Sequence, residues 1–530
     1  MNRIVQIDAA PGSTRSLEIQ RPRYRPEIDG LRALSVFIVI LFHAAHRLLP
    51  GGFIGVDVFF VISGFLITGI ILTDIDRGEF EFTRFYGRRI RRIYPALIFV
   101  LSCCLAWGWF LWSADIYSQL GKSVFGGAYF IANFIQSKSS GYFENSSQTN
   151  PMLHLWSLGV EEQFYIFWPV ILVGLRKYGL NVRTALISII LFSLGLALLD
   201  NRRDPVMTFY APQTRFWELA MGALLAWSGL DRPDWQRRSL TWLDRRLATI
   251  LWERPGPAVG LTLAGASGLA GLVLVGLGVS LTRPSSLFPG WLTLLPALGA
   301  TLIIAAGSKS RTNRWLLANP AAVWFGRLSY PLYLWHWPIL AIFRLETGVE
   351  PQGWSVVGLL ALALILGETT YYLIEKPLRR ARNDGLKTLV LAMAMIAVGA
   401  FGLSIHRFDG LQFRPPIREQ TGLARDLSSI VDLYKFFDVD PTWRKNTCFS
   451  PAVDVGFQQK LDACVDPERP LIFVMGDSHA AMLCPGLKSL QAGSDRAFGI
   501  AQFTNADGPP FSTTIGFPAI GRTTIAPWPT

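Results

Sequence analysis

The sequence predicts an all-α protein that crosses a membrane many times and carries a small α/β domain after its last span. Two properties of the composition support this fold class: 51% of the 530 residues are hydrophobic and only 17% are charged, whereas soluble domains carry about 25% charged residues. In addition, the net charge of +12 comes from basic residues in short segments between long apolar runs. Such clusters indicate membrane topology rather than a nucleic-acid-binding surface.

Twelve apolar runs are candidates for membrane spans, because a helix needs about 20 apolar residues to cross the hydrocarbon core of a bilayer. The fourth run is short and is interrupted by Gly and Asn, so it is the weakest candidate. In chain order the runs lie near residues 33–49, 52–73, 94–113, 123–137, 155–175, 183–199, 213–229, 257–281, 290–306, 321–344, 353–373 and 387–405.

The basic residues orient these runs, since cytoplasmic loops are enriched in Lys and Arg. If the Arg-rich N-terminus is cytoplasmic and the fourth run does not cross, every strongly basic loop is cytoplasmic; if the fourth run crosses, all later loops change sides and the rule fails. We therefore expect eleven spans, a re-entrant or surface fourth segment, and an external C-terminal part. The basic loops are 84–92, 176–183, 232–254, 309–314 and 376–382.

Four regions follow from this topology, and in a bacterial cell the membrane would be the inner one. The N-terminal region is polar and shows no cleavable signal-peptide pattern, and the last region opens with the strand-like run LIFVMG and is periplasmic or extracellular. The regions are a cytoplasmic segment at 1–31, a membrane domain at 32–405, an external linker at 406–470 and a small, incomplete α/β domain at 471–530.

The five cysteines fall into two groups. Cys103 and Cys104 lie inside an apolar run, where cysteine usually serves as a packing residue. Cys448 and Cys464 lie in the external part and could form a disulfide there, although spacing does not establish the geometry. Cys484 is the cysteine left over.

Charged residues inside a span are costly, so they indicate function. Arg32 and His43 in the first run are eleven residues apart, which on an α-helix is within about 20° of three full turns and a rise of about 16 Å. Both side chains therefore project from one face, and the pair suits a phosphate-bearing donor that enters from the cytoplasm and meets a base deeper in the membrane. The alternative is an Arg that extends its charge to the membrane surface and an unrelated, hydrogen-bonded His.

A cluster of arginines, RRIRR at 88–92, lies at the cytoplasmic end of the third run. These arginines either determine topology and contact anionic lipid or bind the phosphates of a donor. Arg215 and Glu218 are three residues apart and share a helix face, so an internal ion pair is the simpler interpretation. Further polar candidates inside the runs are Asp57, Ser63, Glu161, Glu162, Arg327, His336 and Glu368.

Seven long motifs occur in a fixed order across residues 25–380, and through them the chain resembles the membrane acyltransferase-3 family. This family comprises bacterial O-acyltransferases that modify lipopolysaccharide, peptidoglycan and other surface glycans. The motifs are RPEIDGLRALSVFIVILFHA (25–44), GGFIGVDVFFVISGFLIT (51–68), FYGRRIRRIYPA (85–96), HLWSLGVEEQFYIFWP (154–169), TRFWELAMGALLA (214–226), GRLSYPLYLWHWPI (326–339) and YYLIEKPLRR (371–380).

The resemblance implies roles for individual residues. Arg32 and His43 match an Arg-x10-His pair of the family, which the resemblance connects with the acyl donor and with catalysis. The resemblance also implies acetyl-CoA or a related acyl-CoA as co-substrate, with no metal, and a surface glycan as acceptor. The family's Arg-x-x-Arg element matches Arg89 and Arg92, with Arg88 and Arg91 as an overlapping second match, and its signature around the next span includes Glu161, Glu162 and Tyr165.

The segment FVMGDSHAAM (473–482) resembles the first block of the SGNH hydrolases, in which Ser478 would be the nucleophile. That family places an Asp-x-x-His pair near the end of the domain, but this chain has no His after His479, and a residue adjacent to the nucleophile cannot easily activate it. Asn505 could replace the family's oxyanion Asn. The missing portion could follow residue 530, or the domain could be non-catalytic; in either case we expect the chemistry to lie in the membrane domain.

The predicted function is therefore the transfer of an acyl group, with acetyl expected, from cytoplasmic acyl-CoA to a hydroxyl of lipopolysaccharide, peptidoglycan or exopolysaccharide outside the membrane. The first alternative is a transporter or flippase, since buried Arg, His and Glu residues also suit a solute pathway. Against this alternative, the sequence shows no inverted repeat. A non-enzymatic partner in glycan assembly is the second alternative, and no nucleic acid is expected as a partner.

Overall fold

The computed structural model contains two compact units, Met1–Ile417 and Arg418–Thr530. Each unit is described by itself. In the first unit the structure describes residues 24–138, 142, 148–230, 241–247, 249, 261–284, 286, 288–379 and 384–414. In the second unit it describes residues 449–450, 464–467, 470–476, 483–493 and 498–505.

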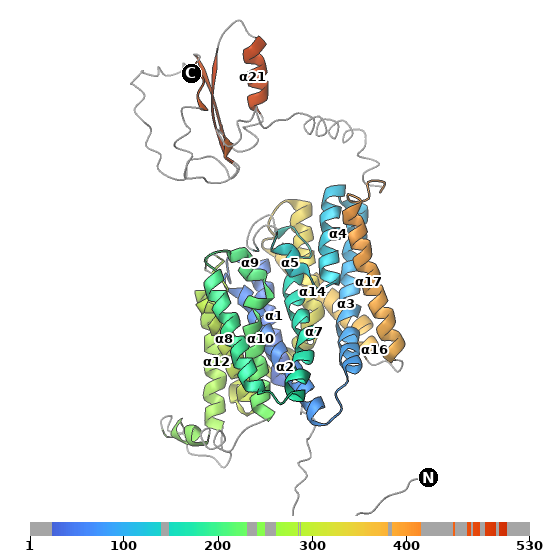
Figure 1. The fold of residues 1–530 in the computed structure, drawn as a ribbon, viewed down its shortest axis with the longest axis vertical. Coiled ribbons are helices and arrows are strands. Elements are labelled where there is room, and N and C mark those ends of the chain that lie inside the picture. Colours follow the sequence, from blue (N-terminus) through green and yellow to red (C-terminus); the bar gives the residue numbers. More distant parts are fainter. Residues whose placement is uncertain are drawn as a thin grey trace, which may run out of the picture. The chain divides into compact units, whose positions relative to one another are not determined.

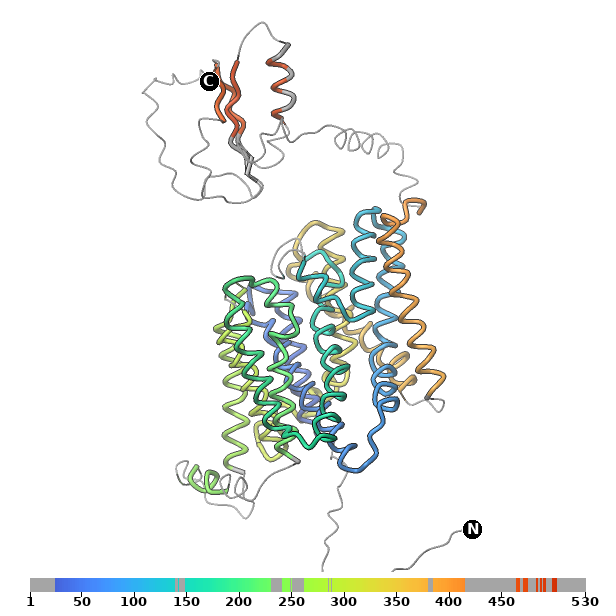
Figure 2. Tube along the Cα trace, viewed as in Figure 1, coloured from blue at the N-terminus to red at the C-terminus, as the bar shows by residue number. Residues whose placement is uncertain are grey.

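The first unit is a bundle of long helices whose chain runs back and forth along one axis (Figures 1 and 2). A helix lies over each of the eleven runs expected to cross the membrane. The main helices are α1 (Pro26–Ala44), α2 (Gly55–Asp76), α3 (Phe82–Leu111), α4 (Ala114–Ala128), α5 (Ala132–Gln136), α7 (Leu155–Lys177), α8 (Val182–Asp200), α9 (Pro205–Tyr210), α10 (Phe216–Leu230), α12 (Leu261–Leu281), α13 (Leu294–Ala306), α14 (Pro320–Thr347), α15 (Trp354–Thr369), α16 (Lys376–Arg379) and α17 (Asp384–Arg407).

Short helical turns join several of these helices. Two of the turns are π-helical, a form that is frequent at functional sites. The turns are η1 (Gly52–Ile54), η2 (Pro212–Thr214), η3 (Trp291–Thr293), η4 (Gly307–Lys309) and the π-helical η5 (Asn313–Leu317) and η6 (Thr370–Glu375).

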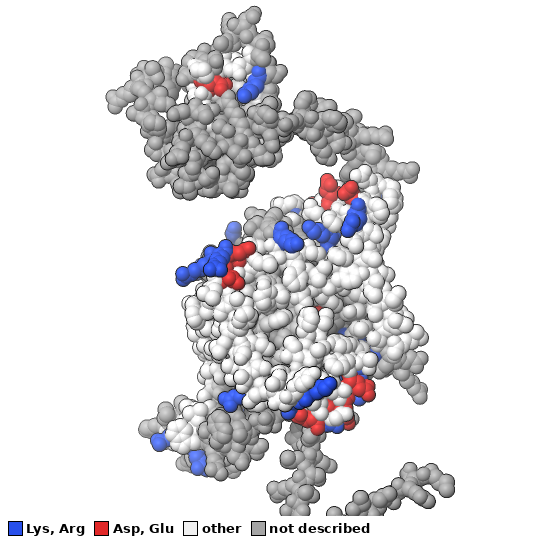
Figure 3. Space-filling view, viewed as in Figure 1, with Lys and Arg blue, Asp and Glu red and all other residues white. Residues whose placement is uncertain are grey.

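Eight continuous helical stretches in the described part of the chain are long and apolar enough to cross a membrane. Five are single helices or nearly so, namely α3, α7, α8, α12 and α17, and three include the turns beside a helix: η1 with α2 (Gly52–Asp76), α13 with η3 and η4 (Trp291–Lys309), and α15 with η6 and α16 (Trp354–Arg379). The chain is therefore a multi-pass membrane protein. Of the other three helices over expected spans, α10 is only 15 residues long, and α1 carries Glu27, Asp29 and Arg32 in its first turns. Figure 3 shows charged side chains at both ends of the bundle with a broad uncharged band between them.

The fourth apolar run forms α4 and the short helix α5. The chain turns between them at Phe130, which has a φ of 56°, and both helices lie at the same end of the bundle (Figure 1). α4 packs along α17 and α3. This arrangement agrees with a re-entrant segment, because the chain enters and leaves from one end.

α1 packs closely against α14 at the centre of the unit. A Cβ atom on Gly326 of α14 would lie 1.9 Å from the Asp29 carbonyl oxygen, and one on Gly30 would lie 1.8 Å from that of Leu317. In a membrane the hydrophobic effect does not drive helices together, so their association depends on close packing. Small residues at such crossings let the two backbones approach. This contact sets the first turns of α1, including Arg32, beside α14.

The second unit contains a parallel three-stranded sheet in the order β1-β3-β2, formed by β1 (Phe449–Ser450), β2 (Leu471–Gly476) and β3 (Gly499–Asn505). Helix α21 (Leu483–Gly493) connects β2 to β3 and buries Cys484 beside Val474 and Ile500. This is an α/β arrangement, as expected for this region. Ser478 lies outside the described residues, so its predicted role stays a prediction.

The cysteine predictions have separate outcomes. Cys464 is disulfide-bonded, whereas its expected partner Cys448 lies outside the described residues. Cys103, Cys104 and Cys484 are free, and Cys104 and Cys484 are buried. The boundaries expected after residues 31, 405 and 470 stay predictions.

Candidate active site

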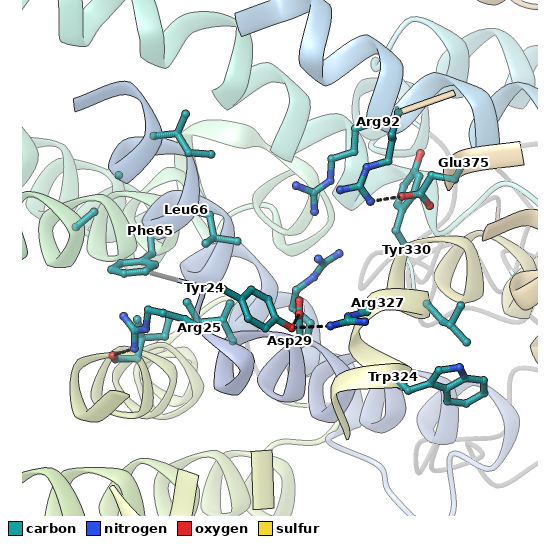
Figure 4. A pocket seen from close by; sticks show the side chains of 18 of the residues that line it. Tyr24, Arg25, Asp29, Phe65, Leu66, Arg92, Trp324, Arg327, Tyr330 and Glu375 are labelled. Atoms are coloured by element: carbon teal, nitrogen blue, oxygen red, sulfur yellow. Dashed lines mark hydrogen bonds and ion pairs between the residues drawn. The ribbon is translucent and has the colours of Figure 1, made fainter. Parts of the chain in front are cut away.

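A large cavity of about 840 Å³ opens beside the N-terminal end of α1. Helices α1, α2, α3, α10, α13, α14 and η6 contribute to its wall, and Figure 4 shows Arg92, Arg327 and Tyr330 facing the same space. Its volume suits a ligand of several hundred Å³. Six basic side chains line the large cavity: Arg25, Arg32, Arg92, Arg327, Lys376 and Arg379.

The basic residues of the large cavity differ in their partners. Arg25 donates to Glu27 at 2.7 Å and to the carbonyl oxygen of Ile304 at 2.5 Å. Arg379 pairs with Glu375 at 3.1 Å. Arg32 and Arg92 form no hydrogen bond or ion pair with any residue that the structure describes. These two guanidinium groups are therefore free to hold an anion.

The structure separates the two overlapping arginine pairs of α3. Arg92 lines the large cavity, and Arg89 stacks on the ring of Tyr165 at 3.9 Å, with Glu162 Oε1 also 3.9 Å away. Arg88 instead pairs with Asp74 at 3.0 Å.

Arg91 donates to Thr388 of α17 at 2.7 Å. Arg89 and Arg92 thus face the centre of the bundle, whereas Arg88 and Arg91 hold neighbouring segments.

A small cavity of about 50 Å³ continues inward from the large cavity, since Arg32 and Tyr330 line both. Its wall comes from α1, α2, α7 and α14 and ends at Ser157 and Tyr333. Tyr333 Oη bonds to Ser157 Oγ at 2.7 Å and donates to the His154 carbonyl oxygen at 2.5 Å. The residues that line the small cavity are Arg32, Val56, Phe59, Phe60, Ser157, Leu158, Glu161, Ser329, Tyr330 and Tyr333.

Glu161 of α7 is fixed by two hydroxyl groups. Ser63 of α2 donates to Glu161 Oε1 at 2.5 Å, and Tyr165 donates to the same oxygen. Glu161 lines the small cavity, so the sequence candidates Ser63, Glu161 and Tyr165 lie together. Glu162 is not part of this group and instead lies beside Arg89, with 3.9 Å between its Oε1 and the guanidinium.

His43 and His336 form a buried histidine pair beyond the small cavity. His43 Nδ1 lies 2.8 Å from His336 Nε2, and the rings stack with centroids 5.1 Å apart. His43 Nε2 lies 2.6 Å from the hydroxyl of Tyr142, and His336 Nδ1 lies 2.7 Å from the carbonyl oxygen of Tyr333. His43 is in the last turn of α1, yet it is level with His336 in the middle of α14.

This chain of hydrogen bonds fixes the tautomers of both neutral rings. The Tyr333 carbonyl can only accept, so the His336 proton is on Nδ1 and His336 Nε2 accepts. His43 must then donate from Nδ1, which leaves a lone pair on His43 Nε2 that faces the hydroxyl of Tyr142. The assignment follows from the hydrogen bonds, and it makes His43 Nε2 a hydrogen-bond acceptor beside the hydroxyl group of Tyr142.

Three residues around the histidine pair were missed in the sequence. Tyr142 lies in a polar loop, and Arg344 lies at the end of an apolar run, where an Arg commonly marks only a membrane boundary. Arg344 is 6% exposed and donates to the His43 carbonyl oxygen at 2.7 Å. His154 is buried with its ring 5.8 Å from that of His336. No sequence spacing connects these positions.

Asp57 does not line either cavity but belongs to a buried ionic group. Arg215 donates to Asp57 at 2.8 Å and to Glu218 at 3.2 Å, which agrees with the ion pair expected for Arg215 and Glu218. The Arg215 guanidinium lies 5.0 Å from the ring of Phe209, which stacks on Tyr142. Asp57 therefore supports the site from behind Tyr142.

The remaining sequence candidates have different positions. Arg327 lines the large cavity and donates to Tyr24 at 3.3 Å. Glu368 on α15 lines neither cavity. Within the described ranges, no group of three or more His, Cys, Asp and Glu side chains is arranged to hold a metal ion.

The chain matches an acyltransferase domain over residues 25–373. It is 31% identical over 371 residues to the peptidoglycan O-acetyltransferase OatA of Listeria monocytogenes and 34% identical over 375 residues to the putative peptidoglycan O-acetyltransferase YrhL of Bacillus subtilis, which in both cases covers 68% of this chain and 56% of the relative. A putative O-acetyltransferase of Staphylococcus aureus is 29% identical over 408 residues, or 72% of this chain and 64% of the relative.

The chain spans little more than half of the length of the first two relatives. No solved structure matches it. The matched domain ends at residue 373 and so does not reach the second unit. It includes the arginine cluster of α3, the histidine pair, all the residues that line the small cavity and most of those that line the large cavity, and it covers well over half of the chain. The chain therefore belongs to the membrane acyltransferase-3 family.

Proposed function

We propose that this protein transfers an acetyl group from cytoplasmic acetyl-CoA to a hydroxyl group of a cell-envelope carbohydrate on the other side of the membrane. One observation carries the proposal: a cavity lined by six basic side chains leads through a second, smaller cavity toward a buried histidine pair. Such an order of features suits a polyanionic donor with a reactive group at its far end. The relatives named as O-acetyltransferases support the same reaction class.

The large cavity is the donor site in this proposal. Arg32 and Arg92 are unpaired with the described residues and take the phosphates of coenzyme A, because guanidinium groups bind phosphate oxygens in a bidentate manner. Tyr24, Trp324 and Tyr371 supply aromatic surface for the base. The acyl end of the donor then points toward the small cavity.

The histidine pair supplies the base. His43 Nε2 removes the proton from a hydroxyl group as its oxygen attacks the carbonyl carbon of the thioester, and the departing thiolate recovers that proton to give coenzyme A. Tyr142 Oη occupies the hydroxyl position at His43 Nε2 in this structure. His336 holds His43 in the required tautomer by accepting from Nδ1.

The proposed topology has eleven spans, with α4 and α5 as a re-entrant segment, the N-terminus in the cytoplasm and the second unit outside. The large cavity then opens to the cytoplasm, because it lies at the N-terminal end of α1. The acceptor is lipopolysaccharide, peptidoglycan or exopolysaccharide. Relatives whose names include peptidoglycan O-acetyltransferase favour peptidoglycan among these.

Inverted membrane vesicles that contain the full chain and radiolabelled acetyl-CoA test the proposal. We expect label in the glycan fraction with the wild-type chain and none with His43→Ala. The control variant is His406→Ala, which changes a histidine that bonds to Ser118 at 3.1 Å, away from the histidine pair. Uptake of a solute without transfer of label would instead favour a transporter.

A further inference from the structure

We infer that the small cavity is an acyl site that accepts acetyl and rejects longer acyl groups, with Ser329 as the hydrogen-bond donor to the carbonyl oxygen of the thioester. The inference rests on the proposed function, since it concerns the same donor. It goes further by assigning the residues that select acetyl over longer acyl groups and the residue that binds the thioester carbonyl. The position, the size and the polarity of the small cavity all support it.

The small cavity lies where the acyl end of the donor must pass. At one side it shares Arg32 and Tyr330 with the large cavity. At the other side it ends at Tyr333, whose carbonyl oxygen accepts from His336. An acyl group in this cavity therefore lies between the basic residues that hold the phosphates and the histidine pair that carries out the transfer.

The size of the small cavity restricts the acyl group. Its volume of about 50 Å³ compares with about 10–15 Å³ that a cavity needs to hold one water molecule, so it accommodates only a few non-hydrogen atoms. Three apolar wall residues are buried and belong to long helices: Val56 and Phe60 on α2 and Leu158 on α7. Interiors of this kind resist expansion because they are close-packed.

The hydrogen bonds of Tyr333 close the far end of the small cavity. Its hydroxyl is held by both Ser157 and the backbone of His154. A longer acyl chain must displace this hydroxyl or a helix wall. Either displacement costs free energy that a two-carbon acyl group does not require.

Ser329 gives the small cavity a polar group without a partner. Its side chain is 1% exposed, and its Oγ has no hydrogen-bond partner among the described residues. A buried hydroxyl without a partner is unfavourable, so Ser329 gains a hydrogen bond when a water molecule or a bound group occupies the cavity beside it. The carbonyl oxygen of a thioester accepts a hydrogen bond of this kind, whereas a wholly apolar void would have no such donor.

The test compares the release of coenzyme A from acetyl-CoA, propionyl-CoA and butyryl-CoA by the full chain in inverted vesicles. For the wild-type chain we expect kcat/KM to fall about 10- to 200-fold for each added methylene, as for other small apolar pockets. Leu158→Ala enlarges the wall and should raise the butyryl-to-acetyl ratio at least tenfold. Such a ratio is measured within one variant, so it does not depend on how much of the variant folds.

The matched control for Leu158→Ala is Leu172→Ala. Leu172 is a buried leucine on the same helix, α7, and lines neither cavity. Both variants lose the same side-chain atoms from a packed region, but only Leu158→Ala should change the butyryl-to-acetyl ratio. An equal change in both variants would overturn the inference.

Ser329→Ala tests the polar group separately. It keeps the size of the cavity and removes the hydroxyl, so kcat/KM should fall about tenfold for acetyl-CoA and propionyl-CoA alike, with their ratio unchanged. An unchanged kcat/KM would overturn the role of Ser329 and leave the cavity as a water site.

Two results separate this inference from the proposed function. If the wild-type chain uses butyryl-CoA as well as acetyl-CoA, the acyl site is wrong and the proposed function stands. If it releases coenzyme A from none of the three thioesters, the proposed function fails and the inference fails with it.

Discussion

The direction of the hydrogen bonds at the histidine pair is the residue-scale feature on which the chemistry depends. One backbone carbonyl, that of Tyr333, determines where the protons of two rings lie. His43 Nε2 is left as an acceptor toward a hydroxyl group. A base of this kind contributes about 10²- to 10⁴-fold to a proton-transfer step.

The first prediction follows from this arrangement. His43→Ala should lower kcat for release of coenzyme A by about 10²- to 10⁴-fold, because it removes the base. His336→Phe should cause a smaller loss, because His43 keeps its ring but loses the acceptor that fixes its tautomer. Initial rates in vesicles with equal amounts of folded protein measure both effects. Equal losses in the two variants would contradict the assignment of the base to His43.

The second prediction concerns the arginines of α3. Arg92→Ala should raise the KM for acetyl-CoA at least tenfold, because a hydrogen bond to a charged group contributes about 1.5–3 kcal/mol. Arg88→Ala is the control: its pair with Asp74 is partly exposed, and such pairs contribute little. Steady-state kinetics with varied acetyl-CoA provide the measurement. A KM that rises as much for Arg88→Ala would mean that the cluster acts only through its total charge.

Part of the site could be predicted from the sequence and part could not. Arg32, His43 and His336 were found because an ionisable residue inside an apolar run stands out against its surroundings. The sequence could not decide between two arginine pairs, Arg89 with Arg92 and Arg88 with Arg91. Both pairs have the same three-residue spacing, so both fit the same motif.

Tyr142 and Arg344 were missed for a different reason. Both contact His43, but along the chain Tyr142 is 99 residues away from it and Arg344 is 301 residues away. Sequence spacing carries no information about contacts of that kind.

At the scale of elements, the crossing of α1 and α14 determines where Arg32 and the histidine pair lie. Gly326 allows the two backbones to approach, since a Cβ there would lie 1.9 Å from the Asp29 carbonyl oxygen. The third prediction is that Gly326→Ala lowers stability by about 1–3 kcal/mol, as overpacked sites do, and also lowers activity. Thermal unfolding in detergent measures the first effect.

Gly358→Ala is the matched control for Gly326→Ala. Gly358 lies in α15, and a Cβ there would meet no atom within 4 Å. Both substitutions add the same methyl group to a long helix. If Gly358→Ala lowers the unfolding temperature as much, the close approach of α1 and α14 is not the cause.

A second element-scale feature is the anchor at the end of α3. Arg414 is fully buried and donates to four carbonyl oxygens at the C-terminal end of α3 and the residues after it, those of Gly108, Trp109, Trp112 and Ser113. A cation at this end also interacts favourably with the helix dipole. The chain that follows α17 is thereby fastened to the turn before α4.

The fourth prediction tests this anchor. Arg414→Ala leaves several buried carbonyl groups without a donor, which should destabilise the first unit by about 1–3 kcal/mol for each group that water does not reach. Activity per folded molecule should not change, because Arg414 lines neither cavity. Arg407→Ala, at an exposed position of α17, is the control. An unaltered unfolding temperature for Arg414→Ala would contradict the prediction.

The helices themselves were well predicted, since apolar runs and helices coincide along the chain. The exceptions are informative. The charged first turns of α1 were assigned to the cytoplasmic segment, but Glu27 is buried against the bundle. The π-helical turn η6, which brings Tyr371, Tyr372 and Glu375 to the large cavity, has no sequence signal, because its extra residue per turn depends on tertiary packing.

At the scale of the whole molecule, the distribution of charge and the position of the large cavity agree with one orientation. Charged residues gather at the two ends of the bundle (Figure 3), and the large cavity opens at the end where α1 begins. A donor with several phosphates cannot cross the apolar band between the ends. In the proposed function the donor therefore comes from the side that the N-terminus faces, and the orientation of the chain decides which side that is.

The fifth prediction tests the orientation with single cysteines. Arg203→Cys lies in the loop between α8 and α9, which the proposed topology places outside, and Arg311→Cys lies between η4 and η5, which it places in the cytoplasm; both positions are exposed. In intact cells a membrane-impermeant maleimide should label only Arg203→Cys, and Arg311→Cys should react after permeabilisation. The wild-type chain provides the labelling background. If α4 crossed the membrane, both later loops would change sides and the labelling pattern would be reversed.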